Sequence, residues 1–595
     1  MAETKKEKIF KFFESNQISF LVFFISMFIF ISFAGTRLFL SDEGIVLDQF
    51  YNLINGSLAL KIAKINVNNG IFMTIGTNLY GKFSYSLPIL SIPTYYILKL
   101  VDSFFGAHFF ILQLWAVAGG LIIFLIGKIR NIKYAKAGGI AAYLILITAN
   151  LYLFKPIYFP KWGELLSIEF TNIIISSFLI LIIYLFFKNF FSNKIALFAS
   201  FFIIIATPIP FYAITLKHHS LTLLLTLLSF YFFYKSYEKK DNKFIYLAYI
   251  SAGLCVWVRI LDGSVLLASL LITDFLIFKR SFKYIISISI VILISLLPFF
   301  IFNFLLLGNP FSIIESIPLT SEPVTINTAK DYIVLEQNPK NATQAQLMKD
   351  LGYTWGGKIK GYWFEVFGYS MFSKLINTFG IFLVSPFLIA ALGFIVSAVK
   401  RKIKWNPTDK LLGLYTILLF GTYGILHILF NIRPLVSIVT DTPVSLEYRY
   451  LLILYIILLY FTLRIDKVMM ILENNLGTIV KLYGIILIIY IIYFIAGFPI
   501  NFINIYYYTS IILISLLFLF ITTYHPVNKN KKTSNLGLHG KSILFLMAFA
   551  LAQASSFLLF YYWSVNMTYL SPSQNITIMP VLNYIIDWMY RTIIY

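Results

Sequence analysis

The sequence predicts an all-α polytopic membrane protein with about fifteen transmembrane helices, a cytoplasmic N-terminus and an outer C-terminus. Of its 595 residues, 59% are hydrophobic and 12% are charged, whereas a soluble chain carries about a quarter charged residues. The apolar residues form blocks of about twenty, such as 18–40 and 284–307, and each block can cross about 30 Å of hydrocarbon as a helix. Such blocks must be helical because lipid offers no partners for free backbone groups.

The orientation of the predicted spans follows from the basic residues, because basic loops stay in the cytoplasm. Eight basic clusters separate the apolar blocks: 5–11, 128–136, 188–194, 235–243, 279–283, 400–404, 464–467 and 529–541. Consecutive clusters must therefore be separated by an even number of crossings. The expected pairs are 137–153 with 167–187, 195–211 with 218–234, 245–260 with 263–278, 284–306 with 376–399, 411–430 with 449–463, and 477–497 with 507–523, followed by a last span at 542–562.

Only the interval between the first two basic clusters does not fit at once, because it holds three apolar stretches: 18–40, 84–101 and 108–127. Three crossings would place every later cluster outside. The stretch 84–101 contains two prolines and a lysine, so it is the weakest candidate for a span. We therefore predict that it forms a helix lying along the membrane within the first outer loop.

These assignments give a cytoplasmic N-terminus at 1–17, a membrane domain at 18–562 and an outer tail at 563–595. The large outer loops are 41–107, 154–166, 308–375 and 431–448. They hold most of the 25 carboxylates, and polar groups at membrane depth are costly unless they have a function. We therefore expect a site on the extracytoplasmic side of the cell membrane.

Charge and cysteine content exclude two classes of function. The net charge of +22 lies in turns between apolar blocks, which is how membrane topology is encoded, so nucleic acid is not an expected partner. The single cysteine, Cys255, excludes intrachain disulfides and cysteine-based metal clusters.

Two outer loops carry acidic candidates. Asp42 and Glu43 follow the first span, and paired carboxylates can act as a general base or hold a divalent cation; alternatively they cap the helix that begins near Gly44. Glu164 lies in the second outer loop with basic and aromatic neighbours that could bind a phosphorylated, sugar-bearing lipid or form an ordinary interfacial belt. Those neighbours are Lys155, Tyr158, Lys161 and Trp162.

Further cations lie at the outer ends of later spans. Lys217 precedes His218 and His219; adjacent histidines do not share a helix face, so phosphate contact or interfacial placement is expected rather than a metal site. Arg259 precedes Asp262, and Arg449 follows Glu447. An arginine at membrane depth needs an anion, which is either the neighbouring carboxylate or a ligand phosphate.

Several of these segments, in this order, resemble the C superfamily of membrane glycosyltransferases, and most closely its dolichyl-phosphate-mannose and aminoarabinose transferase branch. The acidic pair Asp42-Glu43 is followed by Tyr-Gly-Lys-Phe-Ser-Tyr-Ser-Leu-Pro at 80–88, where Leu87 replaces a proline of the family pattern. The remaining elements are Glu164, the segments 253–263 and 303–311, Ser385-Pro386-Phe387 and Tyr448-Arg449-Tyr450.

The resemblance implies a glycosyltransferase that moves a sugar from a polyprenyl- or dolichyl-phosphate carrier to a lipid, glycan or protein acceptor, with inversion. Asp42 would be the general base, while Glu43 and Glu164 would orient the acceptor or hold Mg²⁺ or Mn²⁺, although the branch often works without metal. The expected contacts with the donor phosphate are Lys82, Arg259 and Arg449, with Lys155, Lys161 and Lys217 behind them. The expected contacts with the sugar or acceptor are Tyr85, Tyr158, Trp162, His218 and His219. A transporter or flippase of lipid-linked saccharides is the alternative, but its charges would lie near the midplane rather than at outer helix ends.

Overall fold

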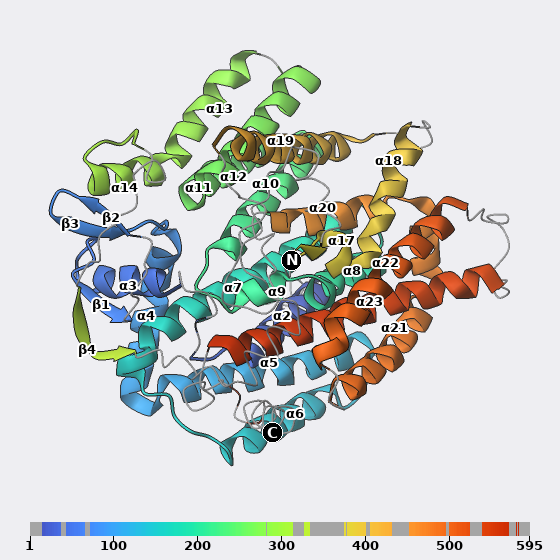
Figure 1. The fold of residues 1–595 in the computed structure, drawn as a ribbon, viewed down its shortest axis with the longest axis horizontal. Helices are drawn as coiled ribbons and strands as arrows, with labels where there is room; N and C mark the ends of the chain where they lie inside the picture. The colour runs from blue at the N-terminus through green and yellow to red at the C-terminus, as the bar shows by residue number, and fades with distance from the viewer. Residues whose placement is uncertain are drawn as a thin grey trace, which may run out of the picture.

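The computed structural model describes residues 15–36, 38, 43–65, 72–280, 282–312, 326–333, 374–375, 378–399, 405–430, 451–495, 499–523, 538–569, 579 and 581. Most of them are helical (Figure 1). The helices up to residue 307 are α2 (Gln17–Phe33), α3 (Glu43–Ile54), α4 (Ser86–Phe105), α5 (Ala107–Ile129), α6 (Ala135–Leu151), α7 (Phe159–Lys188), α8 (Asn193–Ala206), α9 (Ile209–Ala213), α10 (His219–Lys239), α11 (Asn242–Val258), α12 (Ile260–Leu271), the π-helix η1 (Ile272–Ile277), α13 (Phe282–Ser295) and α14 (Leu297–Leu307). The later helices are α17 (Ile381–Val384), the 3₁₀-helix η3 (Pro386–Ala390), α18 (Ala391–Val399), α19 (Pro407–Phe430), α20 (Leu452–Leu463), α21 (Asp466–Ile495), α22 (Pro499–Thr523) and α23 (Leu538–Tyr569).

Helices lie at most of the predicted spans, and the chain is a multi-pass membrane protein. The stretch predicted as one span at 376–399 is instead divided into α17, η3 and α18. Within the described residues, five helices are long and apolar enough to cross a bilayer: Ala107–Ile129, Phe159–Lys188, Ile260–Ile277, Asp466–Tyr493 and Gly540–Leu559. The helices Tyr284–Ser295 and Leu297–Leu307, bent by 42° at Leu296, would form a sixth. Seven further apolar helices within these residues have 10–17 residues, and fifteen crossings and the orientation of the two termini stay predictions.

The first helix is shorter than the predicted block at 18–40. Helix α2 ends at Phe33, where Ala34 adopts an extended conformation. The N–H of Gly35 then donates to the Glu169 carboxylate, with N–O distances of 3.1 and 3.3 Å. A carboxylate on α7 therefore fixes the point where the chain leaves the first helix.

Helix α4 occupies the stretch that we predicted to lie along the membrane. It covers Ser86–Phe105 and contains Pro93. Leu87 and Leu98 on one side are buried, while Leu100 and Phe104 are exposed. The orientation of α4 relative to a bilayer stays a prediction, but an apolar exposed face of this kind is typical of contact with lipid.

Close helix packing depends on glycine where two helices cross. A Cβ atom added to Gly120 on α5 would lie 2.8 Å from the carbonyl oxygen of Gly139 on α6. The same distance separates a Cβ added to Gly139 from the Gly120 oxygen. Small residues allow this approach, which is a common way of joining helices in lipid.

Within the described residues, six short strands depart from the predicted all-helical architecture. They are β1 (Ile62–Ile65), β2 (Phe72–Ile75), β3 (Asn78–Gly81), β4 (Asn327–Ile333), β5 (Lys374–Leu375) and β6 (Thr378–Phe379). Strands β2 and β3 form an antiparallel hairpin with Ile75 opposite Asn78. Gly76 has φ +61°, and positive φ at the first central position suits a two-residue hairpin turn. Strand β1 pairs in parallel with β4.

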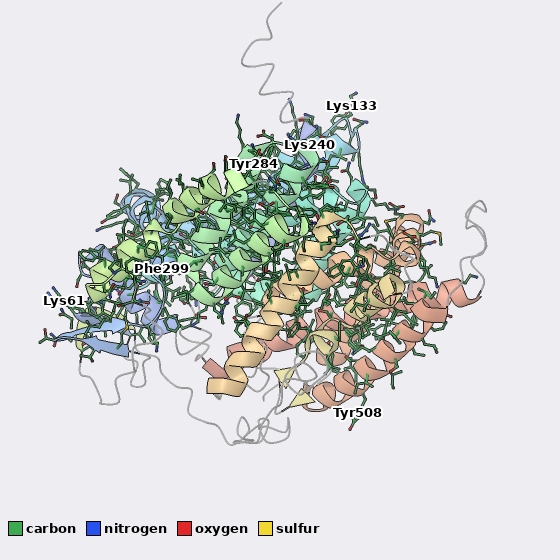
Figure 2. All side chains as sticks on the ribbon, turned by 90° about the horizontal axis from the view of Figure 1, so that it is seen from above. Lys61, Lys133, Lys240, Tyr284, Phe299 and Tyr508 are labelled. Atoms are coloured by element: carbon green, nitrogen blue, oxygen red, sulfur yellow. The ribbon has the colours of Figure 1, made fainter. Side chains whose placement is uncertain are left out.

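The elements formed by the first predicted outer loop gather at one end of the molecule. Figure 1 shows α3, the strands β1 to β4 and one end of α4 together on the left. In Figure 2, Lys61, next to β1, lies at this end, whereas Lys133 and Lys240, in two of the basic turns, lie together on another side.

Candidate active site

Helix α3 begins with the second residue of the predicted acidic pair. Glu43 is its first residue and is fully buried. An acidic side chain in the first turn is favoured by the helix dipole, so this placement agrees with the capping alternative. Asp42 lies outside the described residues, and its role as general base stays a prediction.

Asp48, on the same helix, attaches strand β1 to α3. Its Oδ1 accepts the backbone N–H groups of Lys64 at 2.6 Å and Ile65 at 3.2 Å. Burial raises the pKa of Asp48 to about 7, and the two backbone hydrogen bonds act in the opposite direction. The carboxyl group of Asp48 therefore has a structural function at the base of the outer loop.

The attachment of β1 brings a buried lysine to Glu164. Lys64 Nζ lies 3.2 Å from Glu164 Oε2 and donates to the Pro160 carbonyl oxygen at 2.9 Å. It also lies 5.0 Å from the centroid of the Tyr51 ring. Lys64 is 2% exposed and Glu164 is 5% exposed. Buried charges require such compensation. Lys64 was not among the residues predicted from the sequence.

The loop that carries Lys82 is held between α3 and α11. Gln49 Nε2 donates to the carbonyl oxygens of Gly81 at 3.3 Å and Phe83 at 2.9 Å. Ser84 Oγ donates to the Trp257 carbonyl oxygen at 2.9 Å. Trp257 is two residues before Arg259. These bonds therefore hold the loop that carries Lys82 close to Arg259, although the two segments are far apart in sequence.

Lys217 approaches the same loop from the other side. Its Nζ lies 4.3 Å from the centroid of the Phe83 ring, and its side chain is buried. Asn172, two turns beyond Glu164 on α7, donates to the carbonyl oxygens of Tyr212 at 2.8 Å, Thr215 at 2.9 Å and Lys217 at 3.3 Å. Helix α7 therefore carries Glu164 and also holds the segment that ends at Lys217.

Arg259 and Asp262 form the local pair that the sequence allowed. Arg259 Nη2 lies 3.1 Å from Asp262 Oδ2. Tyr423 on α19 bridges the two, because its hydroxyl accepts from Arg259 at 3.5 Å and donates to Asp262 at 3.4 Å. The structural-pair alternative is thus realised, and contact of Arg259 with a donor phosphate stays a prediction. Arg449 lies outside the described residues.

The aromatic candidates divide into buried and exposed groups. Tyr85 is buried, its hydroxyl donates to the Leu58 carbonyl oxygen at 2.6 Å, and its ring stacks on Phe302. Its hydroxyl is therefore engaged within the protein. Tyr158, immediately before α7, is 62% exposed, whereas Trp162 is buried beneath Lys161.

The remaining cations and histidines lie around the start of α7 and of α10. Lys155 is exposed and Lys161 is half-buried. His219 begins α10, is buried, and packs edge-on against the Tyr212 ring at 5.0 Å, while His218 is half-buried beside it. Contact of any of them with sugar, acceptor or phosphate stays a prediction.

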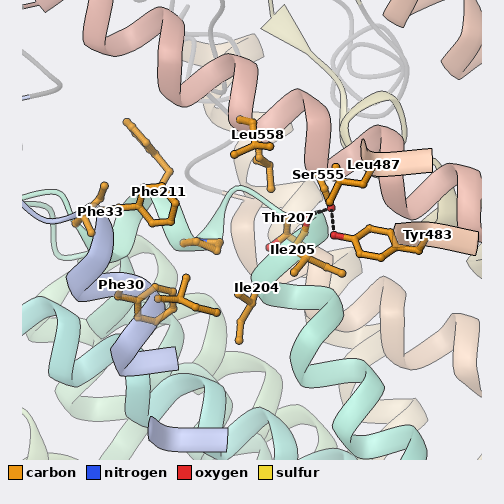
Figure 3. Close-up of a pocket in the computed structure, with 14 residues that line it drawn as sticks. Phe30, Phe33, Ile204, Ile205, Thr207, Phe211, Tyr483, Leu487, Ser555 and Leu558 are labelled. Carbon is orange, nitrogen blue, oxygen red and sulfur yellow. Dashed lines mark hydrogen bonds between the residues drawn. The ribbon is translucent and has the colours of Figure 1, made fainter. Parts of the chain in front are cut away.

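One cavity is lined by residues of this site, and another lies among the apolar helices. The first, a small cavity, is lined by Lys82, Ser84, Trp257, Phe299 and Asn303, among others. A larger one, of about 240 Å³, lies among α2, α8, α9, α21 and α23 (Figure 3). Its wall is almost entirely apolar; Tyr483 and Ser555 are hydrogen-bonded to each other at 3.1 Å, and Ser555 also donates to Ile205. It therefore suits an apolar ligand.

A metal site requires several donors close together. Among the described residues, no three His, Cys, Asp or Glu side chains are grouped closely enough to hold an ion. Glu43 and Glu164 are described, but Asp42 is not, so the possible use of Mg²⁺ or Mn²⁺ stays open.

Comparison with known proteins identifies one segment. Residues 163–305, about a quarter of the chain, match the sequence model of the dolichyl-phosphate-mannose-protein mannosyltransferase family. The match confirms the resemblance to membrane glycosyltransferases of the C superfamily. It includes Glu164, Lys217 and Arg259. No curated protein and no solved structure matches the chain.

Proposed function

We propose that this membrane glycosyltransferase moves one sugar from a polyprenyl- or dolichyl-phosphate carrier to an acceptor hydroxyl on the extracytoplasmic face, with inversion at the anomeric carbon. The acceptor oxygen forms a bond to C1 while the bond between C1 and the phosphate oxygen breaks. The lipid phosphate leaves with the electron pair, and the acceptor proton passes to Asp42. A transporter or flippase has no comparable support in the described residues.

The proposal depends on one observation. Charged side chains from segments that are distant in sequence lie at the same end of the helix bundle. Hydrogen bonds join the Lys82 loop to α3 and to the end of α11, and Lys217 contacts the middle of that loop. A departing phosphate needs positive charge held in place beforehand. Lys82, Lys217 and Arg259 would supply it.

The two acidic groups take different roles in this proposal. Glu164 is paired with Lys64, so its carboxylate is already engaged within the protein. Glu164 therefore positions the outer loop and the acceptor. Asp42 is left as the base, with Glu43 beside it at the start of α3.

The carrier lipid would lie in the apolar cavity of Figure 3. Thr207, Pro210, Phe211 and Ile214 on its wall belong to the segment that ends at Lys217. An isoprenoid tail in this cavity would place its phosphate near that lysine. Burial of the tail would then help to orient the anomeric carbon.

Substitution of the base provides the test. Asp42→Asn removes the proton acceptor with little change in shape, and loss of a general base costs about 10²- to 10⁴-fold in rate. Washed membranes would be supplied with a panel of radiolabelled polyprenyl-phosphate sugars, and transfer to endogenous acceptor would be measured at equal protein level. Glu238→Gln, in an exposed ion pair on α10, is the matched control. Unchanged transfer in Asp42→Asn would remove Asp42 as the base.

A further inference from the structure

The corner between α11 and α12 fixes the backbone of Arg259. This residue stands where α11 ends and α12 begins, and its backbone there is extended. Its N–H donates to the Cys255 carbonyl oxygen at 2.8 Å, and its own carbonyl oxygen accepts from the N–H of Gly263 at 3.0 Å. A Cβ atom added to Gly263 would lie 2.2 Å from the backbone nitrogen of Val256. The corner is therefore tightly packed, whereas the long side chain of Arg259 needs contacts of its own to take one direction.

Two side chains close a triangle with one nitrogen of the guanidinium group. Arg259 Nη2 lies 3.1 Å from Asp262 Oδ2 and 3.5 Å from the Tyr423 hydroxyl oxygen, and that hydroxyl lies 3.4 Å from Asp262 Oδ2. Asp262 and Tyr423 are buried, and the Arg259 side chain is 11% exposed. Asp262 belongs to the same corner, but Tyr423 comes from α19, so the arginine is held from two independent directions. Such contacts select one rotamer of a side chain that has many.

Helix α19 is itself anchored about four turns before Tyr423. Asp409, in its first turn, accepts from the Tyr460 hydroxyl at 2.8 Å and pairs with Arg464 at 2.9 Å. Both partners lie at the end of α20. The Tyr423 hydroxyl therefore reaches Arg259 from a helix whose position is set by contacts elsewhere in the bundle.

The same three residue types meet again at the other end of the span that α12 begins. Asp274, in the π-helix η1, pairs with Arg280 and accepts a hydrogen bond from the Tyr249 hydroxyl at 3.4 Å. Asp274 and Tyr249 are completely buried. Asp274 is about 18 Å from Asp262 along the helix axis. The two clusters share one chemistry, but the cluster at the corner adjoins the loop of the candidate active site, so the other cluster is a control for it.

We propose that Tyr423 is a positioning residue for sugar transfer, whose hydroxyl holds the Arg259 guanidinium in the direction that the departing lipid phosphate requires. The inference rests on the proposed function and adds to it a residue that acts through Arg259. A guanidinium contacts phosphate best through parallel N–H bonds, which depend on the orientation of its plane. Cations held in place beforehand stabilise the developing charge without reorganisation. Loss of the hydroxyl should therefore affect the transition state more than binding of the donor.

A matched pair of substitutions provides the test. Tyr423→Phe removes one hydroxyl and keeps the ring, and Tyr249→Phe makes the same change in the other cluster. The full chain would be assayed in washed membranes at equal protein level, with varied concentrations of the radiolabelled polyprenyl-phosphate sugar that the wild type transfers fastest.

The two variants should differ in rate but not in stability. We expect Tyr423→Phe to lower kcat about tenfold, the size of one hydrogen bond to a charged group, and to leave the KM for the donor within about twofold. Tyr249→Phe should leave both constants within about twofold. Each variant loses one hydrogen bond to a buried carboxylate, so their thermal unfolding midpoints in detergent should fall by similar amounts.

A double variant tests whether Tyr423 acts through Arg259. Arg259→Lys keeps a positive charge opposite Asp262 but removes the planar guanidinium. In this background the loss caused by Tyr423→Phe should shrink from about tenfold to less than about twofold. The same tenfold loss in both backgrounds would show a purely structural role and would overturn the proposal.

The outcomes distinguish this proposal from the proposed function. Equal losses of kcat in the two tyrosine variants, or no loss in Tyr423→Phe, overturn the role of Tyr423 while sugar transfer by the wild type stands. An Arg259→Lys variant as active as the wild type also overturns it, because the guanidinium would then not be needed. If wild-type membranes transfer none of the radiolabelled sugars, both the proposed function and this inference fail.

Discussion

The two ends of helix α7 hold charge in different ways. At its N-terminal end Glu164 and Lys64 are almost completely buried and lie 3.2 Å apart. At its other end Lys188 is exposed at the edge of an open polar cavity. A charge in water needs no partner, whereas a buried charge without one costs several kcal/mol. The N-terminal end is therefore the part of the helix where a single substitution affects both folding and the candidate active site.

The largest expected effect is at Lys64. Lys64→Met leaves Glu164 buried without its cation, which costs about 3–5 kcal/mol when a buried pair is broken on one side. The free energy of unfolding in detergent micelles, followed by tryptophan fluorescence, should fall by this amount. Lys61→Met, at the exposed neighbouring position, should change it by less than about 0.5 kcal/mol.

A second variant decides whether the pair itself is the cause. Lys64→Met/Glu164→Gln removes both charges, so most of the lost stability should return, and the coupling should be about 1–3 kcal/mol. A double variant as unstable as Lys64→Met would show that the lysine stem, rather than its charge, is what the fold requires.

The next effect concerns pH and Asp48. Its folded-state pKa is about 7 against an ordinary value of 3.8, so the folded state binds more protons between these values. Stability should therefore fall as pH rises from 5 to 7, by on the order of 2 kcal/mol for this group. In Asp48→Asn, the midpoint temperature of thermal unfolding should depend less on pH between pH 5 and 7 than it does in the wild type. A variant with the same slope as the wild type would contradict the assignment of the titration to Asp48.

The smallest effect is expected at the opposite end of α7. Lys188→Ala removes an exposed charge, and surface substitutions of this kind change stability by about 0.5 kcal/mol or less. The measurement is thermal unfolding in zwitterionic detergent, without anionic lipid. If Lys188→Ala lost as much stability as Lys64→Met, the two ends of α7 would not differ in the way described above.

The helical framework could be predicted from the sequence because it depends on local composition. The block predicted at 167–187 is contained in α7, which begins earlier at Phe159. The first two turns of α7 were not predicted because they contain Lys161 and Glu164. Charged residues interrupt the apolar pattern from which the span was predicted, although the helix itself continues through them. The pair of Arg259 with Asp262 was also predictable, since residues three apart on a helix are neighbours.

The Lys64 contact could not be predicted, for a physical reason. A lysine in an outer loop is ordinarily solvated, and its partner Glu164 is 100 residues away in sequence. The attachment of β1 to α3, through Asp48 and Asn52, carries Lys64 inward. The same applies to Tyr423, which reaches Arg259 from α19, more than 150 residues further along the chain.

The parallel pairing of β1 with β4 has a consequence for biosynthesis. Ile65 at the end of β1 is opposite Ile333, which the ribosome adds more than two hundred residues later. At about 5–20 residues per second, this delay is on the order of 10–50 s. The early helices must therefore remain in the membrane while this sheet is incomplete, and β1 gains its partner strand only after residue 333 has been synthesised.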